Sequence, residues 1–223
     1  MFTPSVNTSK QLLQRMGAAL SSSLDHIFER SEDWLQIDRD AKQALLQRLG
    51  NASRECPTLY ALHFRLIDQI NADELMMAQT TIDRILSLPC AAAGTQVMSL
   101  GAADAAAELS VIIPFFAESE DARFTFVKPD EAQAAPAVRQ IDDALQLLKK
   151  GAPAFHAEIS DIIPWIVIAA GERTDTNTNS RSSFGGASAM RAFGAVLLNA
   201  ALQGTVFERA LSLVHETSHN LLF

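Results

Sequence analysis

Residues 205–223 read TVFERALSLVHETSHNLLF, and the interpretation of the whole chain starts from this stretch. Thr205 and Glu208 form a T-x-x-E capping box, which is typical of a helix start. No glycine or proline follows Gly204, and apolar residues recur at helical spacings: Val206, Phe207, Ala210, Leu211, Leu213, Val214, Leu221 and Leu222. We therefore predict one helix that begins near Thr205 and carries the pentapeptide H-E-x-x-H.

This pentapeptide is a candidate metal site. Residues four apart on a helix lie one turn apart on the same face, so the imidazoles of His215 and His219 can bind one metal ion. Glu216 is placed to take a proton from metal-bound water or to orient a ligand. The residues around it are uncharged, which suits a half-buried helix because a buried unpaired charge is costly. The alternative is an accidental match on a helix that packs as plain core.

Two histidines are one protein ligand short of a typical catalytic metal site. Only four residues follow His219, whereas familiar H-E-x-x-H enzymes take a third ligand from further downstream. We expect the chain to be a fragment of a longer protein, to bind metal weakly or not at all by itself, and to be inactive alone. An upstream ligand is the alternative, and His156 is the candidate for it.

Composition indicates a soluble globular protein. The chain has 223 residues, 48% of them hydrophobic, and a net charge of −8 without any basic run, which argues against nucleic acid and anionic membranes as partners. No apolar stretch is long enough to span a membrane and no signal peptide is recognisable, so we expect a cytoplasmic location. Cys56 and Cys90 fit neither a metal motif nor a disulfide framework, and we expect both in the core.

The fold class predicted is mainly α with a small β element. Residues 1–90 form a helical region, in which apolar positions repeat at helical spacings and Gly50 marks one helix end. Residues 91–223 form an α+β region within the same compact domain. There, we predict an edge strand over residues 111–116, a strand over residues 124–126, and a helix that begins near Asp130 and ends at Lys150.

The last part of the chain predicts a strand, a loop, a second strand and then the H-E-x-x-H helix. Residues 165–168 are a continuous apolar run typical of a buried strand, and residues 193–199 form the second strand. Between them, residues 172–188 are rich in hydroxyl and amide side chains and read as a loop. This loop either borders a substrate pocket or is a solvated connector.

Residues 182–188, 193–198 and 210–220 together resemble the H-E-x-x-H-type peptide-modification proteins. These are bacterial proteins associated with ribosomally made, modified peptides, and some are regarded as iron- and 2-oxoglutarate-dependent peptide β-hydroxylases. The likeness covers roughly residues 150–223. The pentapeptide itself is shared with zinc peptidases, so the resemblance depends on the serine-rich segment and the Gly-Ala-Val strand before it.

The resemblance implies an Fe(II) site in which His215 and His219 are two ligands, and in which open positions bind 2-oxoglutarate and oxygen. The carboxylates of 2-oxoglutarate need cationic or hydroxyl partners, and Arg181, Ser183 and Arg191 are the candidates by charge and position. A surface role is the alternative for each arginine. The implied partner is a peptide substrate, such as a ribosomally synthesised precursor, and a homo-oligomer is compatible with the sequence.

Two other function classes fit the same residues. In a zinc-dependent hydrolase, His215 and His219 hold the metal, and Glu216 is the general base for attack of water on a peptide carbonyl. In a non-catalytic helical interaction protein, the motif helix is plain core. The metal found on the protein (iron, zinc or none) separates the three classes.

Overall fold

The computed structural model describes residues 6–51, 54–117, 122–201 and 204–222. Helices make up 61% of the structure and strands 15%, which confirms the predicted class, mainly α with a small β element. The helices are α1 (Val6–Ser31), α2 (Arg39–Gly50), α3 (Pro57–Asn71), α4 (Leu75–Ser87), α5 (Ala106–Ile112), α6 (Glu131–Gly151), α7 (Pro153–Ile162) and α8 (Val206–Leu222), with short 3-10 helices η1 (Ile113–Phe116) and η2 (Met190–Ala192).

The strands form one mixed sheet. They are β1 (Gln96–Ser99), β2 (Ala122–Val127), β3 (Trp165–Asp175), β4 (Arg181–Ser183), β5 (Gly186–Ser188) and β6 (Ala195–Asn199). The central order is β1-β3-β6-β5, in which β1, β3 and β6 are parallel and β5 is antiparallel at one edge. The outer half of β3 pairs with β2 and β4, both antiparallel to it. The site described below lies beside the β5 edge.

The core of the sheet is the parallel pair β3 and β6. Side chains of residues 165–169 and of β6 are buried, as expected for parallel strands that are covered on both faces. The structure confirms the strands predicted over residues 165–168 and 193–199, although the second begins at Ala195. After Ala169, β3 leaves the parallel sheet and becomes partly exposed where it pairs with β2 and β4.

Gly171 lies where β3 passes from one kind of pairing to the other. Its φ is 143°, and a Cβ atom there would collide with the carbonyl oxygen of Thr125 in β2. We expect Gly171→Ala to lower the free energy of unfolding by more than about 2 kcal/mol, because it adds both backbone strain and a clash with main chain. The measurement is equilibrium unfolding in denaturant. Gly151→Ala, at a helix end with nothing within 4 Å of the added atom, is the control, and an equal loss in both variants would contradict the prediction.

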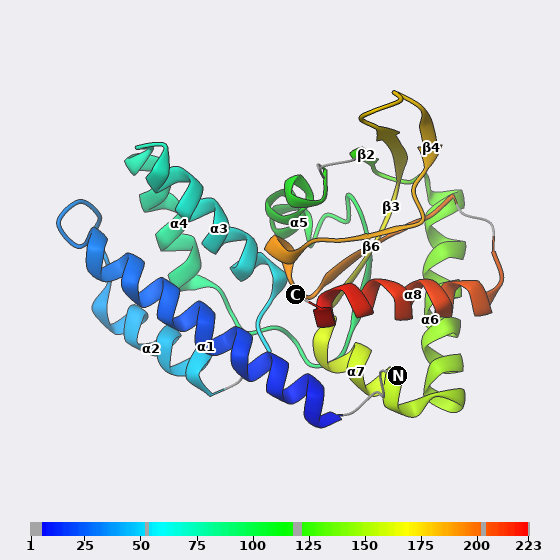
Figure 1. Cartoon of the computed structure of the whole chain (residues 1–223), viewed down its shortest axis with the longest axis horizontal. Coiled ribbons are helices and arrows are strands. Elements are labelled where there is room, and N and C mark those ends of the chain that lie inside the picture. The colour runs from blue at the N-terminus through cyan, green and yellow to red at the C-terminus, as the bar shows by residue number, and fades with distance from the viewer. Residues whose placement is uncertain (1–5, 52–53, 118–121, 202–203, 223) are drawn as a thin grey trace.

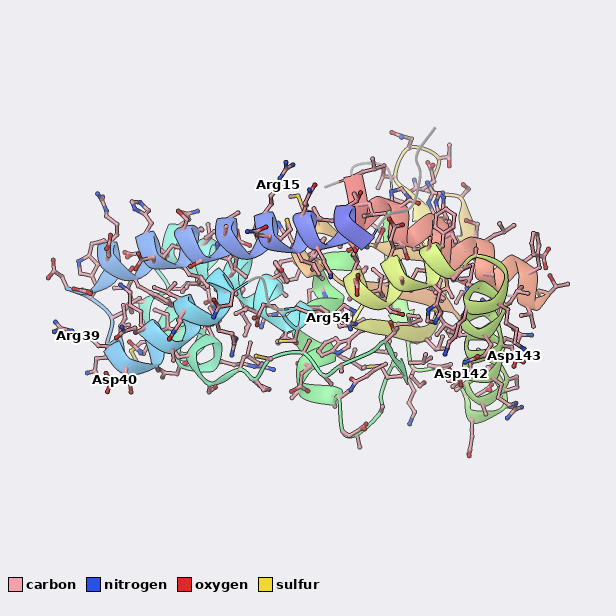
Figure 2. All side chains as sticks on the ribbon, turned by 90° about the horizontal axis from the view of Figure 1, so that it is seen from below. Arg15, Arg39, Asp40, Arg54, Asp142 and Asp143 are labelled. Atoms are coloured by element: carbon pink, nitrogen blue, oxygen red, sulfur yellow. The ribbon has the colours of Figure 1, made fainter. Side chains whose placement is uncertain are left out.

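Figure 1 shows the helices in two groups, with α1 to α4 on one side of the molecule and α6, α7 and α8 around the sheet. One continuous cluster of buried apolar side chains joins both groups, from Leu20 in α1 to Leu213 in α8. Several charged side chains lie on the outside, as Figure 2 shows for Arg39 and Asp40 at one end and for Asp142 and Asp143 on α6. Within the described ranges, no helix has the length and apolar character needed to cross a membrane.

Several local predictions are wrong. Residues 111–116 are not an edge strand but the end of α5 and the 3-10 helix η1, because Pro114 lies in the first turn of η1, where its missing N–H costs nothing. The segment 172–188 is not one loop, since β3 continues to Asp175 and both β4 and β5 follow. The three residues of β4 are polar and exposed, and those of β5 are small and half-buried, so neither strand shows apolar alternation. The expectation for Cys90 is also wrong, because it is exposed, whereas Cys56 is buried.

Candidate metal site and cleft

Helix α8 begins where its capping box predicts. The side chain of Glu208 accepts a hydrogen bond from the backbone N–H of Thr205 at 2.7 Å, and the Thr205 hydroxyl accepts one from the N–H of Glu208 at 3.2 Å. The Glu208 carboxylate accepts hydrogen bonds from both the backbone N–H and the hydroxyl of Thr205, and these hold the pKa of Glu208 below its usual value. Because two free N–H groups of the first turn are satisfied in this way, the start of α8 is fixed by its own sequence.

Both ends of α8 are tied to strand β6. Near the start of the helix, the guanidinium of Arg209 donates to the carbonyl of Asn199 at 2.9 Å. Near its end, the side-chain oxygen of Asn220 accepts from the backbone N–H of Gly194 at 3.0 Å. The helix therefore runs antiparallel to β6, with Leu213 buried against the core and the opposite face open. This anchoring determines which way the H-E-x-x-H residues point.

Asn220 follows the pentapeptide directly and is fully buried. Replacing it by alanine leaves the N–H of Gly194 without its partner, so we expect Asn220→Ala to lower the free energy of unfolding by about 1–3 kcal/mol. Asn177→Ala, at an exposed position, is the matched control and should change stability by less than about 0.5 kcal/mol. Thermal unfolding followed by circular dichroism measures both, and a buried-site variant as stable as the control would contradict this role of Asn220.

The two histidines lie on one face of α8, as predicted. Both are exposed, their Nε2 atoms are 3.1 Å apart, and their rings are nearly perpendicular, at 88°. Two nitrogens that bind one metal at about 2.0–2.1 Å lie about 2.9 Å apart at a right angle and about 3.4 Å apart at the tetrahedral angle. The spacing of His215 and His219 falls between these values. The distance between the two Nε2 atoms therefore matches that between two nitrogens bound to one metal ion.

A third ligand does not join the pair within the described part of the chain. No group of three histidine, cysteine, aspartate or glutamate side chains with metal-binding geometry occurs among these residues. His156, the upstream candidate, lies on α7 and forms no such group with His215 and His219. Among the described residues, His215 and His219 are therefore the two candidate ligands for a metal ion.

Glu216 points away from solvent, in contrast to the two histidines. Its side chain is 6% exposed and accepts a hydrogen bond from the Ser188 hydroxyl of β5 at 3.1 Å. Burial raises the pKa of Glu216, and the hydrogen bond and the nearby histidines partly offset this effect. Gly186 of β5 makes the fit possible, because a Cβ atom there would lie 2.6 Å from the Glu216 carboxylate. A carboxyl group with a raised pKa beside a metal site is suited to accept a proton.

An open cleft of about 440 Å³ lies over the histidine pair, and its size is within the usual range for ligand sites. Its lining comes from η1, β2, the β5–η2 segment and α8: Phe115, Phe116, Phe124, Gly186, Ala187, Ser188, Ala189, Met190, Arg191, His215, Glu216 and His219. A second hollow, of about 400 Å³, lies towards Gly185 and Leu211. His215 and Glu216 line both hollows, so the candidate metal site is between them.

The structure brings one of the three proposed cosubstrate residues into the cleft. Arg191 lines it, whereas Arg181 and Ser183 are exposed on β4 and are absent from its lining. The guanidinium of Arg181 lies 3.7 Å from Glu172 of β3 instead. The second half of the hydroxyl-rich segment does border the cleft, through Ser188 and its neighbours. Gly186 and Ser188 are two residues apart and therefore lie on one side of a strand. This spacing is the sequence signal that could have placed both residues at the cleft.

The chain matches no protein-family model and no curated protein sequence. The resemblance to the H-E-x-x-H-type peptide-modification proteins therefore stays a hypothesis, which rests on the serine-rich segment and the Gly-Ala-Val strand that precede the pentapeptide.

Proposed function

We propose that the protein is a metal-dependent enzyme that oxidises a peptide, in the manner of an iron- and 2-oxoglutarate-dependent peptide β-hydroxylase. The observation that carries this proposal is the exposed histidine pair, with Nε2 atoms 3.1 Å apart, in a cleft whose lining also includes Arg191. Imidazole ligands with open positions suit Fe(II) oxygenases. The guanidinium provides a partner for a carboxylate of 2-oxoglutarate.

In this proposal, each side chain has a defined task. His215 and His219 hold the metal, and a further ligand comes from outside the described residues. With Fe(II) bound, the site would supply the oxidation in which the peptide, oxygen and 2-oxoglutarate are converted to the hydroxylated peptide, succinate and carbon dioxide. Phe115 and Phe124 give the cleft an apolar wall beside the reacting groups. Glu216 orients groups beside the pair through its hydrogen bond with Ser188.

The edge strand β5 supports a peptide as the substrate. β5 pairs with β6 on one side and is the last strand of the central sheet, so its other edge has no partner strand among the described residues. An extended peptide can add to such an edge through main-chain hydrogen bonds. A peptide bound along β5 would lie beside Glu216 and the histidine pair. The two hollows, one on each side of these residues, would be open to its side chains. A precursor peptide made by the ribosome, modified in the cytoplasm, is the substrate we propose.

The test is a reaction of the complete protein, with every metal ligand present, with Fe(II), 2-oxoglutarate, oxygen and a mixture of short peptides. We expect succinate to accumulate together with peptides heavier by one oxygen atom, as mass spectrometry detects. The same mixture with Zn(II), or without 2-oxoglutarate, is the control. Unmodified peptides without succinate, at stoichiometric iron loading, would contradict the proposal.

Zinc-dependent peptide hydrolysis is the second candidate, and the buried Glu216 favours it. A carboxyl group whose pKa is raised by burial, next to two metal ligands, is well suited to be a general base for water. Here Glu216 takes the proton, and the peptide carbonyl on the β5 side receives the attack. Two shorter peptides formed with Zn(II), in the absence of 2-oxoglutarate, would identify this activity. By contrast, both histidines are exposed to solvent. This exposure does not support the third class, a non-catalytic protein in which the motif helix packs as plain core.

A further inference from the structure

Arg191 is a cationic residue in the lining of the cleft, which His215 and His219 also line. It lies in η2, the short turn between β5 and β6, and forms an ion pair with Asp68 of α3, in which Nη1 and Oδ2 are 2.9 Å apart. The two side chains are 47% and 54% exposed, so water competes with this ion pair. Exposed pairs of this kind contribute little to stability. Stability alone therefore gives little reason for a guanidinium at this position.

Two aromatic rings hold the guanidinium in place independently of Asp68. Its central carbon lies 5.3 Å from the ring centre of Phe64 in α3 and 5.8 Å from that of Phe115 in η1. Stacking on aromatic rings orients an arginine without using its N–H groups. Among the described residues, the only hydrogen bond from this guanidinium is the one to Asp68. Since a guanidinium has five N–H donors, most of them stay available to a ligand.

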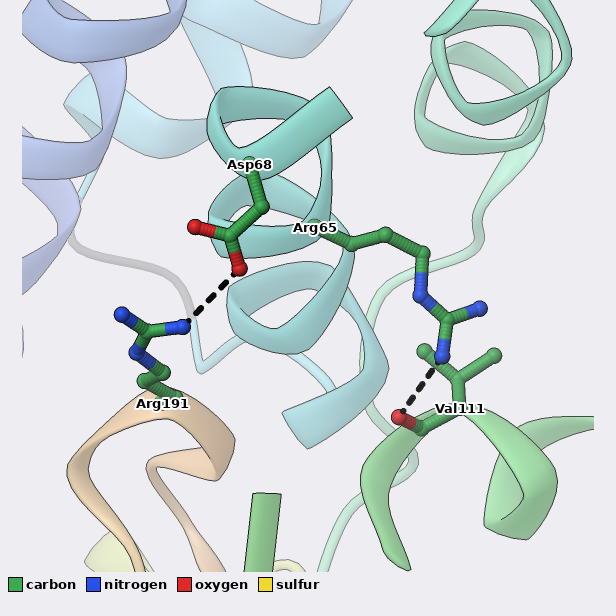
Figure 3. Close-up of polar contacts among 4 residues, drawn as sticks. All are labelled: Arg65, Asp68, Val111 and Arg191. Atoms are coloured by element: carbon green, nitrogen blue, oxygen red, sulfur yellow. Dashed lines mark hydrogen bonds and ion pairs between the residues drawn. The ribbon is translucent and has the colours of Figure 1, made fainter. Parts of the chain in front are cut away.

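Helix α3 of the N-terminal helical group contacts this wall of the cleft from behind, whereas the lining residues come from other elements. Figure 3 shows α3 joined to its surroundings at two points, by Asp68 to Arg191 and by Arg65 to the carbonyl of Val111, at 3.3 Å. The second contact connects α3 to α5, which continues into η1 and Phe115. The position of Arg191 over the cleft thus depends on α3, although α3 and the H-E-x-x-H helix are far apart in the sequence.

We propose that Arg191 binds a carboxylate group of the ligand that enters the cleft, and that Asp68 opposes this binding as an internal competitor. The inference rests on the proposed function, because it takes this cleft as the place where the ligand reacts. Guanidinium recognises carboxylate through paired N–H···O hydrogen bonds, and the Asp68 carboxylate already occupies part of that position. The carboxylate belongs either to 2-oxoglutarate or to an acidic side chain of the peptide.

Calorimetric titration of the dialysed, metal-free chain tests this binding separately from any reaction. The first titrant is 2-oxoglutarate, and the second is an end-blocked peptide with a single aspartate. The matched peptide with asparagine in its place is the control ligand. We expect at least one carboxylate titrant to bind and the asparagine peptide to bind more weakly. Binding of 2-oxoglutarate alone identifies a cosubstrate site, and binding of the acidic peptide alone identifies substrate recognition.

The variants have opposite expected effects. Arg191→Gln should weaken carboxylate binding about tenfold to a hundredfold, because a charge-assisted contact is lost, and Arg191→Lys should lie between it and the native chain. Asp68→Asn should strengthen binding about 1.5- to 5-fold, which corresponds to the release of an exposed ion pair. Arg15→Gln, an exposed position on α1, is the control and should change nothing.

The proposal is wrong if neither carboxylate titrant binds the native chain, or if Arg191→Gln binds them as tightly as the native chain does. Circular dichroism of each variant shows whether it is folded, and Arg191→Lys, which keeps the charge, replaces Arg191→Gln if the latter unfolds. The outcome is independent of turnover. If the chain binds carboxylates through Arg191 but oxidises no peptide, the proposed function is wrong and this inference stands. If the chain is active and Arg191→Gln leaves it unaffected, this inference is wrong and the proposed function stands.

Discussion

Replacing His215 by alanine is expected to abolish the metal-dependent reaction and to lower metal affinity by more than about a hundredfold. Loss of a partner that only supports a ligand already costs about 10–100-fold, and His215 is proposed to bind the metal directly. His219→Ala should have the same effect, because the two Nε2 atoms, 3.1 Å apart, act on one ion. Isothermal titration with Fe(II) and with Zn(II) measures affinity, and product formation measures the reaction.

Two other histidines serve as controls for this prediction. His26 is exposed on α1, far from the pentapeptide in sequence, and His26→Ala should keep both metal and activity. His156→Ala tests the upstream ligand considered from the sequence, and we expect it to keep the metal as well, since His156 forms no metal-binding group with the pair. If metal stays bound in His215→Ala but is lost in His156→Ala, the assignment of the site to α8 is wrong.

Glu216→Gln is expected to separate the two proposed reactions. If the protein hydrolyses peptides with zinc, the variant should retain the metal and lose about 10²–10⁴-fold in rate, because the general base is removed. If it oxidises peptides, the rate should fall by less than about tenfold, since glutamine still accepts the hydrogen bond from Ser188. The measurements are metal content and the rate of the reaction that the native chain performs with each metal. An oxidation rate that falls a hundredfold would contradict the orienting role given to Glu216.

Gly186→Ala provides a matched test of the same carboxylate. The added Cβ would lie 2.6 Å from Oε1 of Glu216 and would push the carboxylate away without removing it. We therefore expect the same pattern as for Glu216→Gln, a large loss of hydrolysis or a small loss of oxidation, with metal still bound. A variant that behaves like the native chain during hydrolysis would show that the position of the carboxylate is unimportant.

The local features of the chain were the predictable ones. The start of α8 follows from Thr205 and Glu208, which satisfy each other's backbone groups within a single turn. The helix over residues 131–151 follows in the same way from Asp130, whose side chain accepts the first-turn N–H of Gln133 at 2.7 Å. The failures occur where the pattern is ambiguous, as for residues 111–116, since a short apolar run suits a buried helix as well as a strand.

The sequence alone determined that His215 and His219 share a helix face, because residues four apart are neighbours wherever an α-helix forms. It did not reveal that Ser188 and Gly186 lie against Glu216, or that Asp68 of α3 contacts Arg191 across 123 positions of the chain. Such contacts depend on strand register and on how separate elements pack against each other. Register and packing are determined by burial of the core as a whole, and they leave no repeating pattern in any single segment. The tertiary structure therefore decided which arginine joins the histidine pair and which strand faces it.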